Sequence, residues 1–118
     1  DKKALRPRRR AAKAPRAILV IFLYCKSYSI GNNFVVACCD EKILGKSLKG
    51  EKYDVTVTEG FYKGEKTEED ELARLLADAN SINLFGEESV GVALKEGLIT
   101  ERDVIRIGGV PHAVIIRI

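Results

Sequence analysis

The last fifteen residues, VIRIGGVPHAVIIRI (104–118), constrain the fold more than any other stretch. Two apolar runs rich in β-branched residues flank the link GGVPH, which predicts antiparallel strands over 104–107 and 113–118. Because glycine accepts positive φ and proline fixes its own φ, we expect residues 108–112 to form a shaped loop. His112 is the only histidine of the chain, and this loop either presents its imidazole or is only a rigid turn.

Three earlier segments also predict strands. Residues 18–28 and 34–39 flank the turn sequence SIGNN and are typical of a hairpin. Residues 52–59 alternate between apolar and polar side chains, which indicates a half-buried strand. The apolar density of residues 113–118 predicts that the last strand lies inside the sheet.

Two helices are predicted between these strands. Thr67 is expected to cap the first helix, which begins with acidic residues and carries the apolar stripe Leu72, Leu75, Leu76 and Ala79. NSINLFG (80–86) breaks this helix, and the second helix covers EESVGVALKE (87–96) and ends at Gly97. The pattern predicts an α+β fold, an antiparallel sheet of about five strands covered on one face by two helices.

Charge divides the chain into an arm and a body. Residues 1–16 contain eight lysines and arginines against one aspartate, a net charge of +7, whereas residues 17–118 have a net charge of −4. Two prolines and no hydrophobic period predict a flexible arm attached to one α+β domain, residues 17–118. The arm is either a solubilising tail or an electrostatic contact with RNA through Arg6, Arg8, Arg9, Arg10, Lys13 and Arg16. It contains no aromatic residue, and any RNA binding by it should therefore be insensitive to sequence.

The apolar run AILVIFLYC (17–25) follows the arm and superficially resembles a secretion signal. No small-residue cleavage site follows it, and it is too short to span a bilayer. We therefore expect a cytoplasmic protein with no membrane segment. The chain lacks tryptophan, methionine and glutamine, and 31% of its residues are charged, which favours a thermophilic source.

The cysteines support the same location. Cys25, Cys38 and Cys39 are an odd set without CxxC spacing. Adjacent residues on a strand point to opposite faces, and Cys38 and Cys39 should therefore not bridge each other. We expect buried, reduced thiols.

Four segments of the chain are distinctive: CDEKILGK (39–46), FYKGE (61–65), NLFGE (83–87) and IRIGGVPHA (105–113), the last being the most specific. They resemble the patterns of a small archaeal family of conserved proteins of unknown function. The resemblance runs from about residue 18 to the end of the chain and leaves out the arm. It implies an archaeal, cytosolic protein. Because genes of this family lie beside translation genes, it also implies a connection to the ribosome or to RNA.

These segments supply the candidate binding residues His112, Gly108, Gly109, Asn83, Gly86, Glu87, Asp40 and Lys46. Asn83 is placed to cap the second helix, whose first N–H groups either receive an anion or form a plain helix corner. Asn83 or Glu87 is expected to hold the ring of His112. Asp40 is expected to cap its own loop, and Lys46 lacks the full spacing of a phosphate loop.

No enzymatic constellation is visible in the sequence. Cys39, Asp40 and His112 are the residue types of a ligand trio or a nucleophile–base pair, but no spacing requires either, and we expect no metal or cofactor. Our first hypothesis is a non-enzymatic binding protein associated with RNA or translation. The alternative is a small-molecule-binding protein or enzyme with a pocket lined by His112, Asn83 and an acidic residue. Convergence of the four segments on a concave pocket favours the alternative; an arrangement along an open face favours the first. The oligomeric state is not determined by the sequence.

Overall fold

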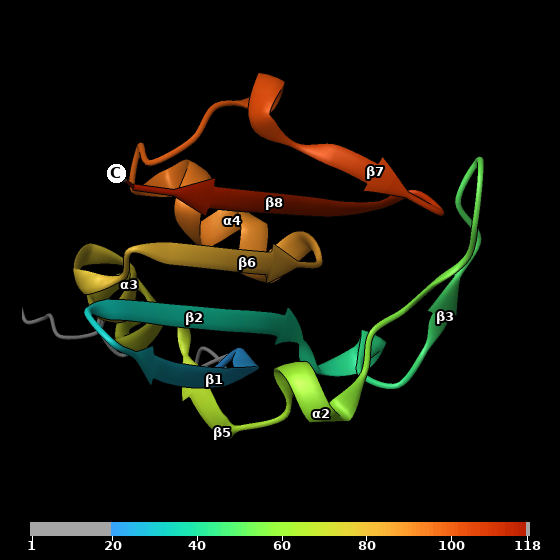
Figure 1. Cartoon of the computed structure of the whole chain (residues 1–118). Helices are drawn as coiled ribbons and strands as arrows, with labels where there is room; N and C mark the ends of the chain where they lie inside the picture. Colours follow the sequence, from blue (N-terminus) through green and yellow to red (C-terminus); the bar gives the residue numbers. More distant parts are fainter. Residues whose placement is uncertain (1–19, 118) are drawn as a thin grey trace, which may run out of the picture.

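The structure, a computed structural model, describes residues 20–117 and has a mixed sheet at its centre (Figure 1). Its elements, in chain order, are β1 (Phe22–Ile30), β2 (Asn33–Asp40), the 3-10 turn η1 (Glu41–Ile43), β3 (Ser47–Leu48), β4 (Val55–Thr56), α2 (Glu59–Tyr62), β5 (Glu65–Glu68), α3 (Glu69–Asp78), β6 (Ser81–Phe85), α4 (Glu87–Lys95), η2 (Glu101–Asp103), β7 (Ile105–Ile107) and β8 (Val110–Ile116). Six strands form the main sheet in the order β5-β1-β2-β6-β8-β7, and β3 pairs with β4 separately. Only β2 and β6 run parallel within the main sheet of the described chain.

Helices α3 and α4 pack against one side of this sheet, which we call the helix face (Figure 1). The core between them includes Leu72 and Leu76 of α3, Val90 of α4 and Leu84 of β6, each at most 1% exposed. The predicted α+β class, with two helices on one face of the sheet, is therefore confirmed. None of the helices in residues 20–117 is long and apolar enough to cross a membrane.

The opposite side, which we call the front face, carries a second core. Residues 41–62, the cover segment, run from η1 through β3 and β4 to α2 and pack over part of this face, burying Val57 and Phe85. The rest of the front face is uncovered. On its β7–β8 side the exposed aliphatic side chains are Ile105, by 58%, Val114, by 52%, and Ile116, by 69%.

The main sheet has six strands with one parallel pair, where about five strands, all antiparallel, were predicted. The segment expected to break the first helix, residues 80–86, contains β6, which lies in the middle of the sheet. Ile82 and Leu84 point toward the helix face and alternate with Ser81 and Asn83, but the strand has only five residues and its serine and asparagine are typical of a turn. β5 was not predicted either. The strand expected over 52–59 is reduced to β4 in the small sheet.

Thr67 is not the cap of the first helix, contrary to the prediction. It lies in β5, and its hydroxyl donates to the carbonyl oxygen of Glu65 at 3.0 Å. Glu68 occupies the N-cap position without a side-chain hydrogen bond. The helix keeps the expected acidic first turn, which stabilises the positive end of its dipole.

The link GGVPH is shorter than predicted. Gly108 and Gly109, with φ of 58° and 81°, form a two-residue turn between Ile107 and Val110. Two consecutive positive φ values match the right-handed twist of a tight hairpin, and glycine adopts them without strain. His112 therefore projects from strand β8, where the sheet fixes its position more firmly than a loop would.

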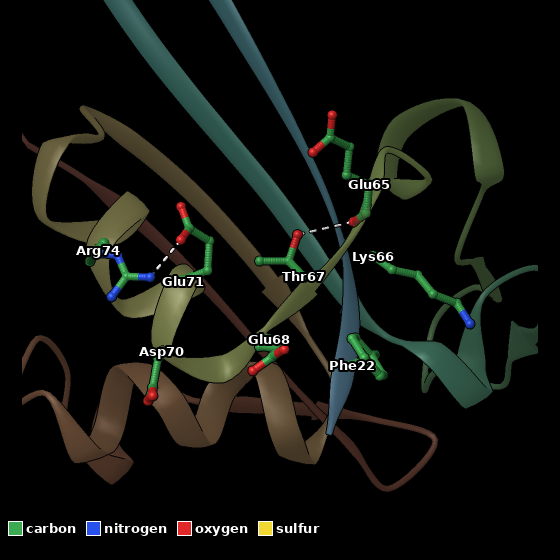
Figure 2. Close-up of a pocket in the computed structure, with 8 residues that line it drawn as sticks. All are labelled: Phe22, Glu65, Lys66, Thr67, Glu68, Asp70, Glu71 and Arg74. Atoms are coloured by element: carbon green, nitrogen blue, oxygen red, sulfur yellow. Dashed lines mark hydrogen bonds and ion pairs between the residues drawn. The ribbon is translucent and has the colours of Figure 1, made fainter. Parts of the chain in front are cut away.

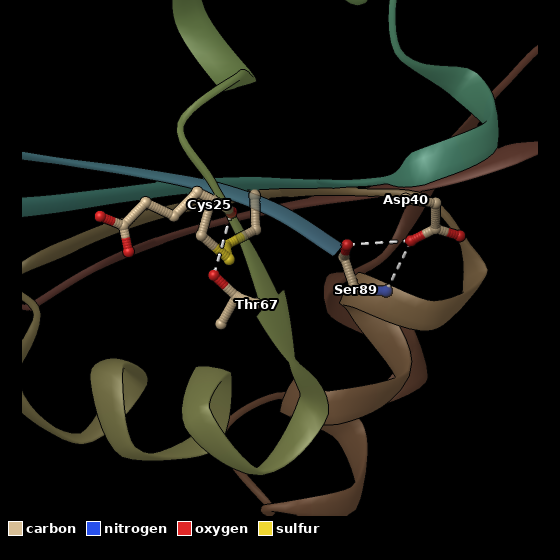
Figure 3. The surroundings of a disulfide bond; sticks show 6 residues. Cys25, Asp40, Thr67 and Ser89 are labelled. Atoms are coloured by element: carbon tan, nitrogen blue, oxygen red, sulfur yellow. Dashed lines mark hydrogen bonds between the residues drawn. A yellow bond between two sulfur atoms is a disulfide. The ribbon is translucent and has the colours of Figure 1, made fainter. Parts of the chain in front are cut away.

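A disulfide joins Cys25 of β1 to Cys38 of β2, contrary to the prediction of reduced thiols (Figure 3). The hairpin register pairs the two residues directly, and their Cα atoms are 4.2 Å apart. Both side chains point to the helix face, whereas Cys39 points to the front face and is a buried free thiol. The expected opposite orientation of Cys38 and Cys39 is present.

The disulfide gives a simple chemical prediction. Alkylation of the unfolded, unreduced protein should label one thiol, Cys39, because the other two cysteines of the chain are bonded. Adding a reductant should raise the count to three and lower the free energy of unfolding by about 3 kcal/mol, the entropic estimate for a loop of this size. Mass spectrometry and thermal melts measure both. Three labels without reductant would contradict the cross-link.

Candidate functional site

Three polar side chains meet on the front face, at the border between its covered and open parts. The hydroxyl of Tyr62 donates to Oδ1 of Asn83 at 2.5 Å, and Nε2 of His112 lies 3.1 Å from the same oxygen. Because an amide oxygen only accepts, Nε2 carries the imidazole proton. We call these residues the polar trio. The contact expected between His112 and Asn83 is present, and Tyr62 joins it from α2.

The pairing of β6 with β8 brings the trio together. Phe85 is directly opposite His112, and Asn83 is opposite Val114. The N–H of Gly86 donates to the carbonyl oxygen of Pro111 at 2.8 Å, and the ladder ends there because proline has no N–H to return a bond. Asn83 is therefore a mid-strand residue, and the prediction that it caps the second helix is wrong.

Aromatic rings extend from the trio across the front face. Successive ring centroids are 6.1, 4.8, 6.2 and 4.5 Å apart in the row Tyr28, Phe61, Tyr62, Phe85 and His112. The middle of this aromatic row is buried, with Tyr62 5% and Phe85 2% exposed, whereas Phe61 is 39% exposed. Pairs at such distances and tilts stabilise one another. The row therefore holds the cover segment to the sheet. Its exposed ring, Phe61, lies near β1.

The imidazole of His112 is neutral in the folded protein at pH 7. Its Nδ1 is buried and meets no hydrogen-bond partner among the described residues. Burial lowers the pKa of His112 below its ordinary 6.5, because a charged ring would be poorly solvated there. The ring therefore acts as a hydrogen-bond donor through Nε2.

This pKa shift has a stability consequence. Below about pH 6.5 the unfolded chain binds a proton at residue 112 that the folded chain resists, and the folded state should lose stability as the pH falls. His112→Gln keeps a side-chain donor but cannot titrate. Urea unfolding between pH 7.5 and 5 should show the variant gaining stability relative to the wild-type protein as the pH falls. A constant difference across this range would contradict the assigned pKa direction.

Cys39 does not form a catalytic or ligand group with His112. Phe85 lies between them in the sheet register, and Asp40 points to the helix face. Burial, with a smaller contribution from the charge of Asp40, raises the pKa of Cys39 to about 12. The thiol is therefore protonated at neutral pH and is a poor nucleophile. The three residues considered as a trio from the sequence are not assembled.

Asp40 is a buried carboxylate, 2% exposed, that caps α4 (Figure 3). Its Oδ1 accepts from the N–H and the hydroxyl of Ser89 at 2.8 and 2.9 Å, and its Oδ2 accepts from the N–H of Glu88 at 2.9 Å. The helix start considered as an anion site is therefore filled by the protein's own carboxylate. The prediction that Asp40 caps its own loop is wrong, since η1 receives no side-chain bond from it.

Gly86 makes this arrangement possible. It precedes α4 with φ of 114° and ψ of 161°, a conformation essentially restricted to glycine. A Cβ at this position would overlap the carboxyl group of Asp40. The close approach for which Gly86 was singled out is therefore to Asp40.

The remaining candidates lie around the trio or apart from it. Glu87 pairs with Arg106, whose Nη1 is 3.2 Å from Oε2 of the glutamate and donates to the carbonyl oxygen of Gly109 at 3.3 Å. Glu87 therefore braces the hairpin and does not hold His112. Lys46 is exposed in the cover segment, where its backbone pairs with Val57. The cations of the arm lie outside the described residues.

The larger surface cavities lie elsewhere. A groove of about 430 Å³ lies between β5 and the start of α3 (Figure 2) and is lined by Phe22, Glu65, Lys66, Thr67, Glu68, Asp70, Glu71 and Arg74. Arg74 is already paired with Glu71 at 2.6 Å, which leaves the groove predominantly acidic. Three further cavities of 340 to 410 Å³ in the described chain are also lined by residues outside the polar trio.

The fold and this site define a class of α+β protein whose sheet has two helices on one face and a partly uncovered front face. The chain belongs to the family described as protein of unknown function (DUF424), whose model matches residues 28–118. It is similar to the crystal structure of an uncharacterized conserved protein from Methanopyrus kandleri, with 29% identity and a TM-score of 0.72. That match covers 82% of this chain and 94% of the other, and its archaeal source agrees with the resemblance in the sequence. None of the curated proteins is significantly similar to this chain.

Proposed function

We propose that this protein is a non-enzymatic binding protein that acts in the cytoplasm and associates with RNA. The observation that carries the binding function is the open part of the front face. Ile105, Val114 and Ile116 are each more than half exposed there, beside the fixed polar trio. Exposed apolar side chains that adjoin oriented polar groups are typical of a surface that contacts another macromolecule.

RNA is the partner that the charge distribution favours. Eight cations in the first sixteen residues suit a polyanion, and each phosphate they neutralise would release counterions. The described body has the opposite charge and an acidic groove, and the arm therefore supplies the attraction. The family resemblance, with its link to translation genes, points to ribosomal or messenger RNA as the source of that polyanion.

A small-molecule pocket is less well supported. The four distinctive segments do converge, but they meet on an open sheet face and within the core beneath the cover segment. None of the cavities described above is lined by a residue of the polar trio, and the buried Nδ1 of His112 is out of reach of a ligand. Because the four segments meet on a sheet face and not in a concave pocket, their arrangement favours a binding role over catalysis.

Crosslinking in native cell extract tests this proposal. The full-length protein is irradiated in extract of its source cells, purified under denaturing conditions and analysed for attached RNA and protein. We expect RNA to be recovered, with ribosomal or messenger sequences enriched over an unirradiated control. Recovery of protein partners alone would contradict the RNA association and leave the front face as a protein-binding surface.

A further inference from the structure

We propose that Phe61, supported by Tyr28 and Lys26, forms a base-stacking site for single-stranded RNA at the β1 side of the front face. This inference rests on the proposed RNA association and assigns it a specific place. Phe61 is 39% exposed although it belongs to a row of otherwise packed rings. Every base has a flat face that stacks on an exposed aromatic ring, largely without regard to sequence.

The backbone that carries Phe61 is held rigidly by β1. The hydroxyl of Tyr28 donates to the carbonyl oxygen of Phe61 at 3.0 Å, and Nζ of Lys26 donates to that of Gly60 at 2.8 Å. The rings of Tyr28 and Phe61 are 27° from parallel, and the ring of Tyr62 meets Phe61 edge-on at 4.8 Å. A ring fixed in this way loses little freedom when a base stacks on it.

The surroundings of the ring suit a nucleotide. The ammonium of Lys26 lies 5.5 Å from the centre of the Tyr28 ring, where it is placed to meet the phosphate that accompanies a stacked base. Space beside Gly60 is open, since a Cβ there would meet no atom within 4 Å. α2 and its C-cap carry one acidic residue, Glu59, and one basic residue, Lys63, and have no net charge.

The position of the site also complements the arm. The described chain begins at Val20, two residues before β1, and Lys26 and Tyr28 follow on that same strand. At about 3.3 Å per residue, Phe22 and Tyr28 are roughly 20 Å apart along the strand. The arm precedes β1 in the sequence, and two residues of the proposed stacking site lie on the same strand that the arm leads into. The arm would supply attraction and the ring would supply a fixed contact.

The test compares two matched substitutions in the full chain. Phe61→Leu keeps an apolar side chain but removes the stacking face, and Tyr53→Leu makes the same kind of change at a 74% exposed ring of the loop between β3 and β4. Fluorescence anisotropy with a labelled ten-nucleotide oligouridine measures affinity, and thermal melts check that both variants fold. We expect Phe61→Leu to weaken binding about tenfold and Tyr53→Leu to change it less than twofold. Ultraviolet crosslinking of the unmodified chain to the same RNA should label the peptide that contains Phe61.

The outcomes separate this site from the proposed function. RNA binding by the wild-type chain that Phe61→Leu leaves unchanged, with crosslinks confined to the arm, would overturn the stacking site and leave the RNA association intact. Failure of the wild-type chain to bind the oligonucleotide at low salt would overturn both.

Discussion

Gly86→Ala should destabilise the protein by about 4 kcal/mol, the largest effect we expect from a single substitution. Alanine would have to adopt the backbone conformation of Gly86, with φ of 114°, and its methyl group would overlap the buried carboxylate of Asp40. For a domain of about 100 residues this corresponds to a loss of roughly 15 to 30 °C in Tm. Thermal and urea unfolding measure the change directly.

Gly91 offers a matched control five residues later in α4. It is helical, and a Cβ there would meet no atom within 4 Å. Gly91→Ala should therefore be neutral or stabilise the protein by up to about 1 kcal/mol, through the better helix propensity of alanine. Similar losses in the two variants would show that α4 tolerates no added methyl group anywhere, and the account of Gly86 would then be wrong.

Asp40→Ala should cost about 3 kcal/mol of stability. The substitution removes the acceptor of two backbone N–H groups and one hydroxyl at the start of α4, of which the two donors of Ser89 are buried and that of Glu88 is partly buried. Asp54→Ala is the control: this carboxylate is paired with Lys49 at the surface and should contribute less than about 1 kcal/mol. Urea unfolding measures both, and equal effects would contradict the capping role.

The two positions should also be coupled. Because the methyl group that Gly86→Ala adds would overlap the Asp40 carboxylate, removing the carboxylate first should relieve part of the strain. The double variant Asp40→Ala, Gly86→Ala should therefore be more stable than the sum of the single effects predicts, by about 1 kcal/mol or more. If the two effects on the free energy of unfolding were strictly additive, the destabilisation by Gly86→Ala would come from its backbone conformation alone.

The parts of the fold that could be predicted from the sequence depend on local signals. Two hairpins, an amphipathic helix and a second helix that stops before Gly97 are each defined within about twenty residues. The parallel pairing of β2 with β6 joins residues more than forty apart, and no local pattern defines such a partner. β6 was missed because Ser81 and Asn83 occupy its front-face positions and resemble a loop.

The disulfide could have been found from the sequence. Cys25 lies five residues before Ile30 and Cys38 lies five residues after Asn33, and these two residues close the predicted hairpin turn. Symmetric placement about a two-residue turn puts the cysteines opposite each other on one face. We predicted reduced thiols from the expected cellular compartment and from the absence of CxxC spacing, and did not take this hairpin register into account.

The candidate site was only partly predictable for a related reason. The contact between His112 and Asn83 was expected because both lie in distinctive segments, and β6 and β8 pair in a register that produces it. Tyr62 and Ser89 were missed, since each reaches its partner across a large sequence separation. Glu87 was predicted to hold His112, but it pairs with Arg106 of β7 instead.

The central claim is that the protein binds RNA through a basic arm attached to a body with an open sheet face, and the salt dependence of RNA affinity tests it most directly. For the full chain, the logarithm of the affinity should fall linearly with the logarithm of the salt concentration. About 0.7 is expected for each phosphate neutralised on a single strand, and the eight cations of the arm therefore set a limiting slope near −6. The variant Arg8→Glu, Arg9→Glu, Arg10→Glu should bind at least tenfold more weakly at low salt and show a much shallower slope. Affinity that is insensitive to salt, or equal for the two proteins, would contradict the claim.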